Sequence, residues 1–252
     1  MTGGVSDSRW KAAQRGEAEY WEFANANTGE LARIIREKVD GLKAATRAVP
    51  AFGESKGPTL EIGIGPRGLG VSQLLPISGI RIGVDPLPVS RTTEGVPPTL
   101  VKLLRKFWQD YLHVKGRGEE LPLPNDSMDN IFCYNVLDHV QNPLAVLREG
   151  LRVLKPGGYL FLGCDVLSLA GLMKFYLYFR PTHKNSLTVV CHPFRFQAGQ
   201  LLRMVETAGF SILWANRRKH EILERLMGHA YRVIMVARKP GLSDFQKPAT
   251  SI

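Results

Sequence analysis

Long apolar runs are absent from this sequence. The longest candidate, residues 167–179, is shorter than the roughly 20 apolar residues that a membrane-spanning helix needs, and it contains Lys174. The polar stretch Met1 to Trp10 also lacks the apolar core of a signal peptide. We therefore expect a cytoplasmic protein without a membrane span.

Cysteine is scarce as well. The sequence contains three cysteines, Cys133, Cys164 and Cys191, and their spacing matches no common metal-binding pattern. An odd, small number of cysteines argues against a disulfide framework of the kind found in small secreted domains. We expect buried, reduced thiols.

Acidic residues are outnumbered by basic ones, 23 against 33, which gives a formal net charge of +10. Such a charge permits an acidic partner but does not require one. The basic residues are spread along the chain, without a recognisable nucleic-acid-binding module or a basic stripe interleaved with aromatic residues. We expect no nucleic-acid partner and interpret the charge as a solvated basic surface.

A glycine-rich turn is the most informative feature that is present. The short apolar run over residues 59–62 leads into Gly63, Gly65 and Gly68, which satisfy G-x-G-x-x-G. Twenty residues after Gly65, a second apolar run ends in Asp85, whose carboxylate can accept from both hydroxyls of a ribose. The pattern predicts a βαβ unit that binds a nucleoside-containing cofactor.

Two classes of cofactor fit this opening, NAD and S-adenosylmethionine. Pro66 lies inside the turn and lacks the N–H that a pyrophosphate-binding site would use. Glu61 lies on the strand, two residues before the first glycine. Both details favour S-adenosylmethionine.

The pattern of elements divides the chain into parts. Residues 1–57 form an N-terminal helical cap in which residues 1–10 are disordered, and residues 58–240 form an α/β domain with a mostly parallel sheet, because strands and helices alternate. This alternation fails over residues 165–197, which we interpret as an acceptor-pocket insertion. A helix is expected near residues 221–229, and residues 241–252 are expected to form a flexible tail.

Four sequence blocks resemble, in their order, the class I S-adenosylmethionine-dependent methyltransferases, in the broad group that includes small-molecule and sugar methyltransferases. The blocks are Leu60–Gly65 (LEIGIG), Val84–Asp85, Leu121–Asp129 (LPLPNDSMD) and Leu151–Leu160 (LRVLKPGGYL). The resemblance implies a Rossmann-like, seven-stranded, mostly parallel sheet with the last strand antiparallel and helices on both faces. Dehydrogenases lack the second pair of blocks in this arrangement.

The resemblance also implies roles for the residues near the cofactor. Gly63 and Gly65 should lie against its methionine and ribose portions, and Asp85 should accept from the ribose hydroxyls. Glu61 should either organise the loop or reach the methionine amine. Asn135, at the end of the fourth strand, should face the methyl-donor region.

The adenine contact departs from the family pattern. Relatives often carry an acidic residue followed by a small one after the third strand, and the matching positions here are Arg117 and Gly118. Glu119 or Glu120 is the alternative acceptor for the adenine amino group.

Methyl transfer from a sulfonium is an in-line displacement that requires alignment and, for a hydroxyl acceptor, removal of a proton. Asp138 and His139 follow the fourth strand, at the sheet edge where open α/β folds bind ligands, and a neutral histidine can take a proton at pH 7. His192, in the insertion, is the second candidate base. The same three residues are a possible site for a divalent metal such as Mg²⁺.

The insertion combines aromatic and basic residues, which suit a sugar or a polyphenol and equally suit a membrane-facing lid. Asp138–His139 and the loop with His192 and Pro193 most resemble methyltransferases that modify carbohydrates or natural products. This resemblance implies O-methylation of a saccharide or glycosylated small molecule by a His/Asp base. One alternative is a C-methyltransferase of a quinone or lipid that makes peripheral membrane contact, and another is a non-catalytic binding protein that keeps the fold. The N-terminal helices offer apolar surface for a homodimer.

Overall fold

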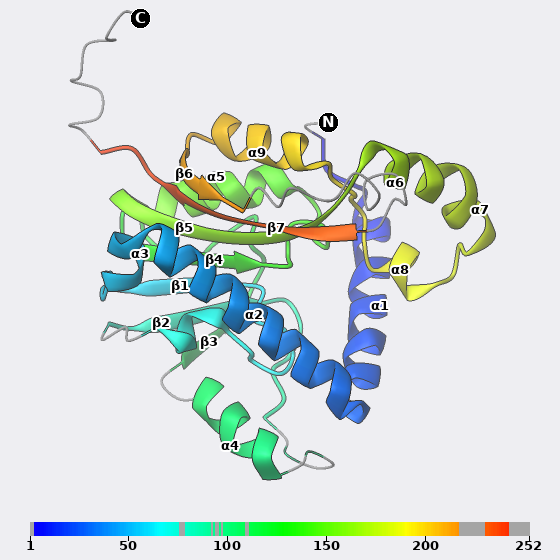
Figure 1. The fold of residues 1–252 in the computed structure, drawn as a ribbon, viewed down its shortest axis with the longest axis horizontal. Coiled ribbons are helices and arrows are strands. Elements are labelled where there is room, and N and C mark those ends of the chain that lie inside the picture. The colour runs from blue at the N-terminus through cyan, green and yellow to red at the C-terminus, as the bar shows by residue number, and fades with distance from the viewer. Residues whose placement is uncertain are drawn as a thin grey trace, which may run out of the picture.

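A seven-stranded sheet forms the centre of the computed structural model, which describes residues 3–75, 79–91, 93, 96, 98–108, 111–216 and 230–241 (Figure 1). The strand order is β3-β2-β1-β4-β5-β7-β6, and all pairs are parallel except the two that β7 makes with β5 and β6. This confirms the expected sheet. The strands are β1 Thr59–Ile62, β2 Arg81–Asp85, β3 Tyr111–Lys115, β4 Met128–Tyr134, β5 Leu154–Leu167, β6 Ser211–Ala215 and β7 Ala230–Arg238.

Helices cover both faces of the sheet. In Figure 1, α2 crosses one face, while α5 and α9 lie together on the other. The helical segments are α1 Asp7–Ala26, α2 Thr28–Ala48, α3 Pro50–Glu54, η1 Val71–Leu74, α4 Pro98–Phe107, α5 Pro143–Val153, α6 Leu169–Lys174, η2 Phe175–Phe179, α7 Arg180–Thr182, α8 Leu187–Val190 and α9 Ala198–Thr207.

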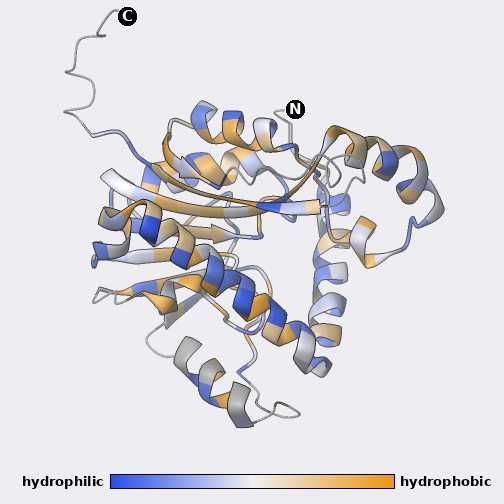
Figure 2. Ribbon diagram, in the orientation of Figure 1, coloured by the Kyte–Doolittle hydropathy of each residue, from blue (hydrophilic) through white to orange (hydrophobic). Residues whose placement is uncertain are grey.

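Strand β4 shows why the core has two layers. Successive side chains of a strand point to opposite faces. Ile131 and Cys133 therefore join the cluster under α5 and α9, whereas Phe132 joins the cluster under α2 and α3. On the second face the rings of Phe52, Phe132 and Phe161 lie 5.5–5.8 Å apart between centroids. Figure 2 shows apolar residues along the central strands, while α2 carries both polar and apolar residues.

The start of the chain is more ordered than its composition predicts. Helix α1 begins at Asp7, where the Ser6 hydroxyl accepts from the Arg9 N–H, so the expectation of disorder is wrong for residues 7–10. The Arg9 guanidinium donates to the carbonyls of Val190 and Val189 at 2.6 and 2.9 Å. These hydrogen bonds to residues far away in the sequence fix the position of the polar N-terminal segment.

The insertion is also more regular than expected. Strand β5 continues to Leu167 because β7 pairs with it as far as Ala230, and four short helical segments, α6, η2, α7 and α8, follow. The helix expected over residues 221–229 and the tail from residue 242 onward lie outside the described residues.

All three cysteines are free and buried, as predicted. Within the described ranges, no helix combines the length and apolar character needed to cross a membrane.

Candidate active site

The glycine-rich loop follows β1 and has a backbone that side chains would disrupt. Gly63 and Gly65 adopt φ angles of +74° and +70°, which L-residues rarely occupy. A Cβ atom at position 63 would lie 2.2 Å from Val136 Cγ2. The backbone can therefore approach a ligand here only because both positions are glycine.

Asp85 ends β2 and closes the loop. Its Oδ2 accepts from the Gly65 N–H and its Oδ1 from the Leu87 N–H, both at 2.8 Å. Burial raises the pKa of the Asp85 carboxyl to about 6, and these two hydrogen bonds offset the effect only in part. The carboxylate lines the main pocket of the protein, as a group that binds a ribose must.

Glu61 organises the loop from beneath rather than lining the pocket. Its Oε1 accepts from the Val71 N–H at 2.6 Å, and its Oε2 accepts from the Tyr111 hydroxyl at 2.6 Å and from the Ser72 N–H and hydroxyl at 3.0 and 2.9 Å. The residue is 1% exposed. Of the two roles expected for Glu61, the structure supports the organising one.

The helical cap contributes walls that the sequence did not reveal. Trp21 of α1 packs against the loop, with its Cζ2 atom 3.0 Å from where a Cβ of Gly65 would lie. Lys38 of α2 is buried beside the pocket and donates to the Leu69 carbonyl at 2.6 Å. Burial lowers the pKa of the Lys38 amine to about 8. In the sequence, the apolar periodicity around Trp21 indicates only that its side chain packs against the protein. No sequence motif marks Lys38 as a residue of the pocket.

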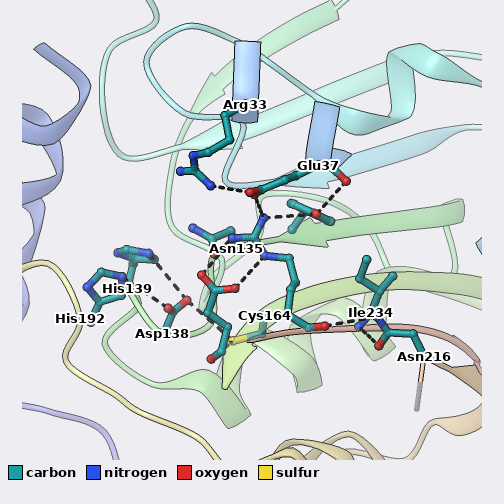
Figure 3. Close-up of polar contacts among 12 residues, drawn as sticks. Arg33, Glu37, Asn135, Asp138, His139, Cys164, His192, Asn216 and Ile234 are labelled. Atoms are coloured by element: carbon teal, nitrogen blue, oxygen red, sulfur yellow. Dashed lines mark hydrogen bonds and ion pairs between the residues drawn. The ribbon is translucent and has the colours of Figure 1, made fainter. Parts of the chain in front are cut away.

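Asn135 lies in the pocket because a network from β7 holds it (Figure 3). Arg232 donates to both carboxylate oxygens of Asp165 at 2.8 and 2.9 Å, to Asn135 Oδ1 at 3.2 Å and to Glu37 Oε2 at 2.8 Å. Asn135 itself has a φ of 61°. Sequence reasoning identified Asn135 but missed Arg232 and Glu37, which border the same pocket.

On the adenine side, Gly118 lies in the pocket wall and is buried. A Cβ there would lie 2.8 Å from Ile62 Cγ2, so the position requires glycine. Arg117 stacks over the Trp10 ring at 4.2 Å and hydrogen-bonds to Gln141. The unusual Arg117 thus joins α1 to the sheet.

The two acidic candidates beside it differ in position. Glu119 borders the pocket, but its Oε1 accepts from the Gln141 and Asn142 N–H groups at 2.7 and 3.1 Å, just before α5. Glu120 is exposed and does not line the pocket. The structure therefore brings Gly118 and Glu119 to the cofactor side and leaves Glu120 outside it.

Asp138, His139 and His192 come together beside the pocket, which His139 alone of the three lines (Figure 3). Asp138 Oδ1 lies 3.7 Å from His139 Nε2, and Asp138 Oδ2 lies 3.7 Å from His192 Nε2. The two imidazole rings are 4.4 Å apart between centroids. His139 Nδ1 lies 3.0 Å from the Cys191 carbonyl oxygen and 3.1 Å from Glu17 Oε2.

The charges of the two histidines differ from the neutral pair that we expected. Burial lowers the pKa of His139, but the Glu17 and Asp138 carboxylates outweigh burial and raise it to about 10. Burial and the nearby His139 charge lower the pKa of His192 to about 2. At neutral pH, His139 is a cation and His192 is neutral.

The histidine pair separates two cavities. His139 borders the main pocket, whereas His192 borders a second cavity between α1 and the insertion. The second cavity is lined by aromatic and basic side chains, among them Phe175, Tyr176, Arg180, Lys184 and Arg195. A ligand in each cavity would meet the other at this pair.

Comparison with protein families identifies the fold around this site. Residues 60–162, which carry the glycine loop, Asp85 and the Asp138–His139 pair, match a family described as a methyltransferase domain. This part of the chain, about two fifths of its length, therefore resembles the methyltransferase domain of the class I S-adenosylmethionine-dependent enzymes.

The curated proteins that the chain matches include uncharacterized methyltransferases of mycobacteria. An uncharacterized methyltransferase of Mycobacterium bovis is 29% identical over 162 residues, which cover 64% of this chain and 56% of the relative. One from Mycobacterium leprae is 37% identical over 90 residues, covering 35% of this chain and 30% of the relative. The chain thus spans little more than half the length of the first of these relatives.

Solved structures share the fold at low sequence identity. A putative methyltransferase from Bacillus halodurans has a TM-score of 0.54 at 16% identity and covers 77% of this chain and 98% of its own. The [4+2]-cyclase SpnF has a TM-score of 0.54 at 21% identity and covers 82% of this chain and 81% of its own. At these identities the likeness concerns the fold alone.

The lining of the main pocket fits S-adenosylmethionine, the cofactor of the methyltransferases that this domain resembles. Asp85 offers a carboxylate to a ribose diol, and the glycine backbone permits close approach. Lys38 and Arg232 place positive charge in the same pocket, where the carboxylate of an amino-acid moiety can pair with it.

The pKa of Asp85 predicts a pH dependence of cofactor affinity. Because both of its oxygens already accept an N–H, a proton on this carboxyl would displace a loop contact and remove an acceptor for the ribose. With a pKa of about 6, we expect S-adenosylhomocysteine to bind about tenfold more weakly at pH 5 than at pH 7.5. Calorimetric titration at both pH values measures this change.

Asp85→Asn is the control for this titration. It should bind weakly at both pH values, because the amide neither ionises nor accepts at both positions. The charges of Glu17 and Lys38 also act on Asp85, and Glu17→Gln tests how much Glu17 contributes to the pH dependence of cofactor binding. A wild-type affinity that stays constant across this range would remove Asp85 from the ribose role.

Proposed function

We propose that this protein transfers a methyl group from S-adenosylmethionine to a hydroxyl of a saccharide or glycosylated small molecule. The observation that carries the proposal is the adjacent pair of His139 and His192, one bordering each cavity, with ring centroids 4.4 Å apart. A donor in the main pocket and an acceptor in the second cavity would place their reacting groups there.

Different residues of the site hold the cofactor and act on the acceptor. S-adenosylmethionine, when bound, supplies a methyl group that is already activated as a sulfonium. Asp85 and the loop glycines hold the nucleoside end, and Asn135 lies at the methyl-donor end. His139, a cation at neutral pH, orients the acceptor hydroxyl, and the neutral His192 beside Asp138 receives its proton.

The second cavity supports an acceptor with both apolar faces and polar edges. Phe175 and Tyr176 offer ring faces to the C–H surfaces of a sugar, and Arg195 stacks over Phe175 at 4.9 Å. Arg180 and Lys184 can bind hydroxyl, phosphate or carboxylate groups at the rim.

A C-methyltransferase of a quinone or lipid is the second candidate, and one observation favours it. The insertion exposes large apolar side chains, namely Leu169, Met173, Leu177 and Tyr178, which are 55–75% exposed. Such a patch suits contact with a lipid surface. Sedimentation with phosphatidylglycerol vesicles separates this candidate from a saccharide enzyme, because only the former should bind them.

A non-catalytic role is the third candidate. The [4+2]-cyclase SpnF shares the fold, so the fold by itself does not specify methyl transfer. Binding of S-adenosylhomocysteine without transfer to any acceptor would favour this role.

The test combines cofactor binding with turnover. We expect S-adenosylhomocysteine to bind with micromolar affinity while NAD, the control, does not, and we expect mass spectrometry to detect methylated product in a saccharide panel. His192→Ala should lower turnover by about tenfold or more, because it removes one group from the base cluster, while cofactor affinity persists.

His183→Ala is the matched control, because His183 lies in the same insertion but is exposed and stacks on Phe179 away from both cavities. It should keep wild-type turnover. If His192→Ala and His139→Ala both turn over at the wild-type rate, the proposed base cluster is wrong.

A further inference from the structure

Among the described residues, two buried side chains, Asp138 and His139, each have an atom without a hydrogen-bond partner close to the partly exposed His192. Asp138 and His139 are 1% and 8% exposed, and within the described part of the chain Asp138 Oδ2 and His139 Nε2 have no hydrogen-bond partner. One ligand atom from each of Asp138, His139 and His192 lies within 4.8 Å of the others. Leaving buried polar atoms without a partner costs free energy, so the arrangement calls for a bound group.

The tautomers of both histidines follow from their other ring nitrogens. His192 Nδ1 lies 3.0 Å from the Thr188 carbonyl oxygen, and His139 Nδ1 lies 3.0 Å from the Cys191 carbonyl oxygen. A carbonyl can only accept, so each Nδ1 carries a hydrogen. A metal ion that displaces the proton from His139 Nε2 would therefore find the Nε2 lone pairs of both rings beside the Asp138 carboxylate.

We propose that Asp138, His139 and His192 form a binding site for one divalent transition-metal ion, with a carboxylate oxygen and two Nε2 atoms as its ligands. Two imidazoles and one carboxylate suit Zn²⁺, Mn²⁺, Fe²⁺ or Co²⁺, whereas Mg²⁺ prefers oxygen ligands alone. The donor set thus favours a different metal from the Mg²⁺ that the sequence suggested. Small side-chain adjustments would close the 3.7 Å separations to the spacing of ligands around one ion.

The residues behind the ligands resemble the supporting shell of a metal site. Metal-binding histidines usually donate their second N–H to a carboxylate or carbonyl, which fixes the ring orientation. Here Glu17 and the Cys191 carbonyl do so for His139, and the Thr188 carbonyl does so for His192. The Cys164 thiol approaches Asp138 Oδ1 at 3.8 Å, which leaves Oδ2 for the ion.

A metal at this point would border both cavities and would acidify a hydroxyl bound to it. That consequence rests on the proposed function, whereas metal binding itself does not. The site therefore gives the acceptor hydroxyl a means of losing its proton without requiring a strongly basic side chain.

The experiment is a titration of the chelator-treated, tag-free protein with ZnCl2 by calorimetry and with CoCl2 by visible absorption. We expect one Zn²⁺ per chain and ligand-field bands from bound Co²⁺. Asp138→Asn and His192→Ala should each weaken Zn²⁺ binding by about 100-fold or more, and Glu17→Gln by about tenfold through loss of His139 orientation. His183→Ala should bind Zn²⁺ as the wild type does.

Affinity for S-adenosylhomocysteine is the control for folding, because Asp138 and His192 are not among the residues that line the pocket containing Asp85. A variant that loses Zn²⁺ but keeps this affinity supports the site. Zn²⁺ binding that is absent in the wild type, or unchanged in both His192→Ala and Glu17→Gln, overturns it. If the protein transfers a methyl group but binds no metal, the metal site is wrong and the proposed function stands. If it binds Zn²⁺ but transfers no methyl group, the proposed function is wrong and the metal site stands.

Discussion

Gly63→Ala should weaken binding of S-adenosylhomocysteine by about 100-fold. The new Cβ would lie 2.2 Å from Val136 Cγ2 and 3.0 Å from its Cγ1, at a φ of +74° that alanine adopts at a cost of about 1–2 kcal/mol. Val136 leads into Asp138 and His139, so relief of the clash would move either the loop or the start of the base cluster. Calorimetric titration of the purified variant measures the loss.

Gly157→Ala separates strain from the clash. Gly157 has a φ of +82°, but a Cβ there would meet no atom within 4 Å. This variant should lose about 1 kcal/mol of stability and bind the cofactor normally. In the double variant Gly63→Ala with Val136→Ala, part of the affinity should return. Wild-type affinity in Gly63→Ala would show that the loop does not need its close approach.

Glu61→Ala should lower the free energy of unfolding by about 3–5 kcal/mol, the second large effect that we expect. The carboxylate is 1% exposed and accepts from two backbone N–H groups and from the Ser72 and Tyr111 hydroxyls. Alanine would leave the Val71 and Ser72 N–H groups buried without their acceptor, and the Ser72 and Tyr111 hydroxyls with only each other. Urea denaturation followed by circular dichroism measures the change.

Two further variants test the cause. Glu61→Gln keeps the shape but turns an amide N–H₂ toward donors, so it should recover only part of the stability. Tyr111→Phe removes one donor and should cost about 1 kcal/mol, because the carboxylate keeps its other partners. If Glu61→Ala instead folds with wild-type stability and loses only cofactor affinity, Glu61 binds the methionine amine.

The sequence predicted the parts of the site that lie on consecutive elements of the sheet. The glycine loop and Asp138 follow strands, and Asp85 is the last residue of β2. In a parallel sheet, the carboxyl ends of neighbouring strands lie at one edge. Periodicity and glycine spacing report such local geometry directly. The seven-stranded fold was predictable for the same reason.

Contacts between distant segments were not predictable. Arg232 holds Asn135 across a separation of 97 residues, and no local pattern marks either partner. Glu17 likewise sets the charge of His139 from the first helix, so a histidine that resembled a neutral base is a cation at neutral pH. The ionisation of a side chain depends on packing that a single sequence does not record.

Helix α1 has a practical consequence for work with shortened chains. The family match covers residues 60–162, so a fragment cut to those bounds would keep Gly63, Asp85 and His139. It would lack Glu17 and Trp21 of α1, together with Arg232 of β7. Such a fragment would display every motif by which the chain resembles methyltransferases, and yet it would lack the residues that wall the main pocket and the carboxylate that faces His139. A failure of the fragment to bind cofactor would therefore say nothing about the intact protein.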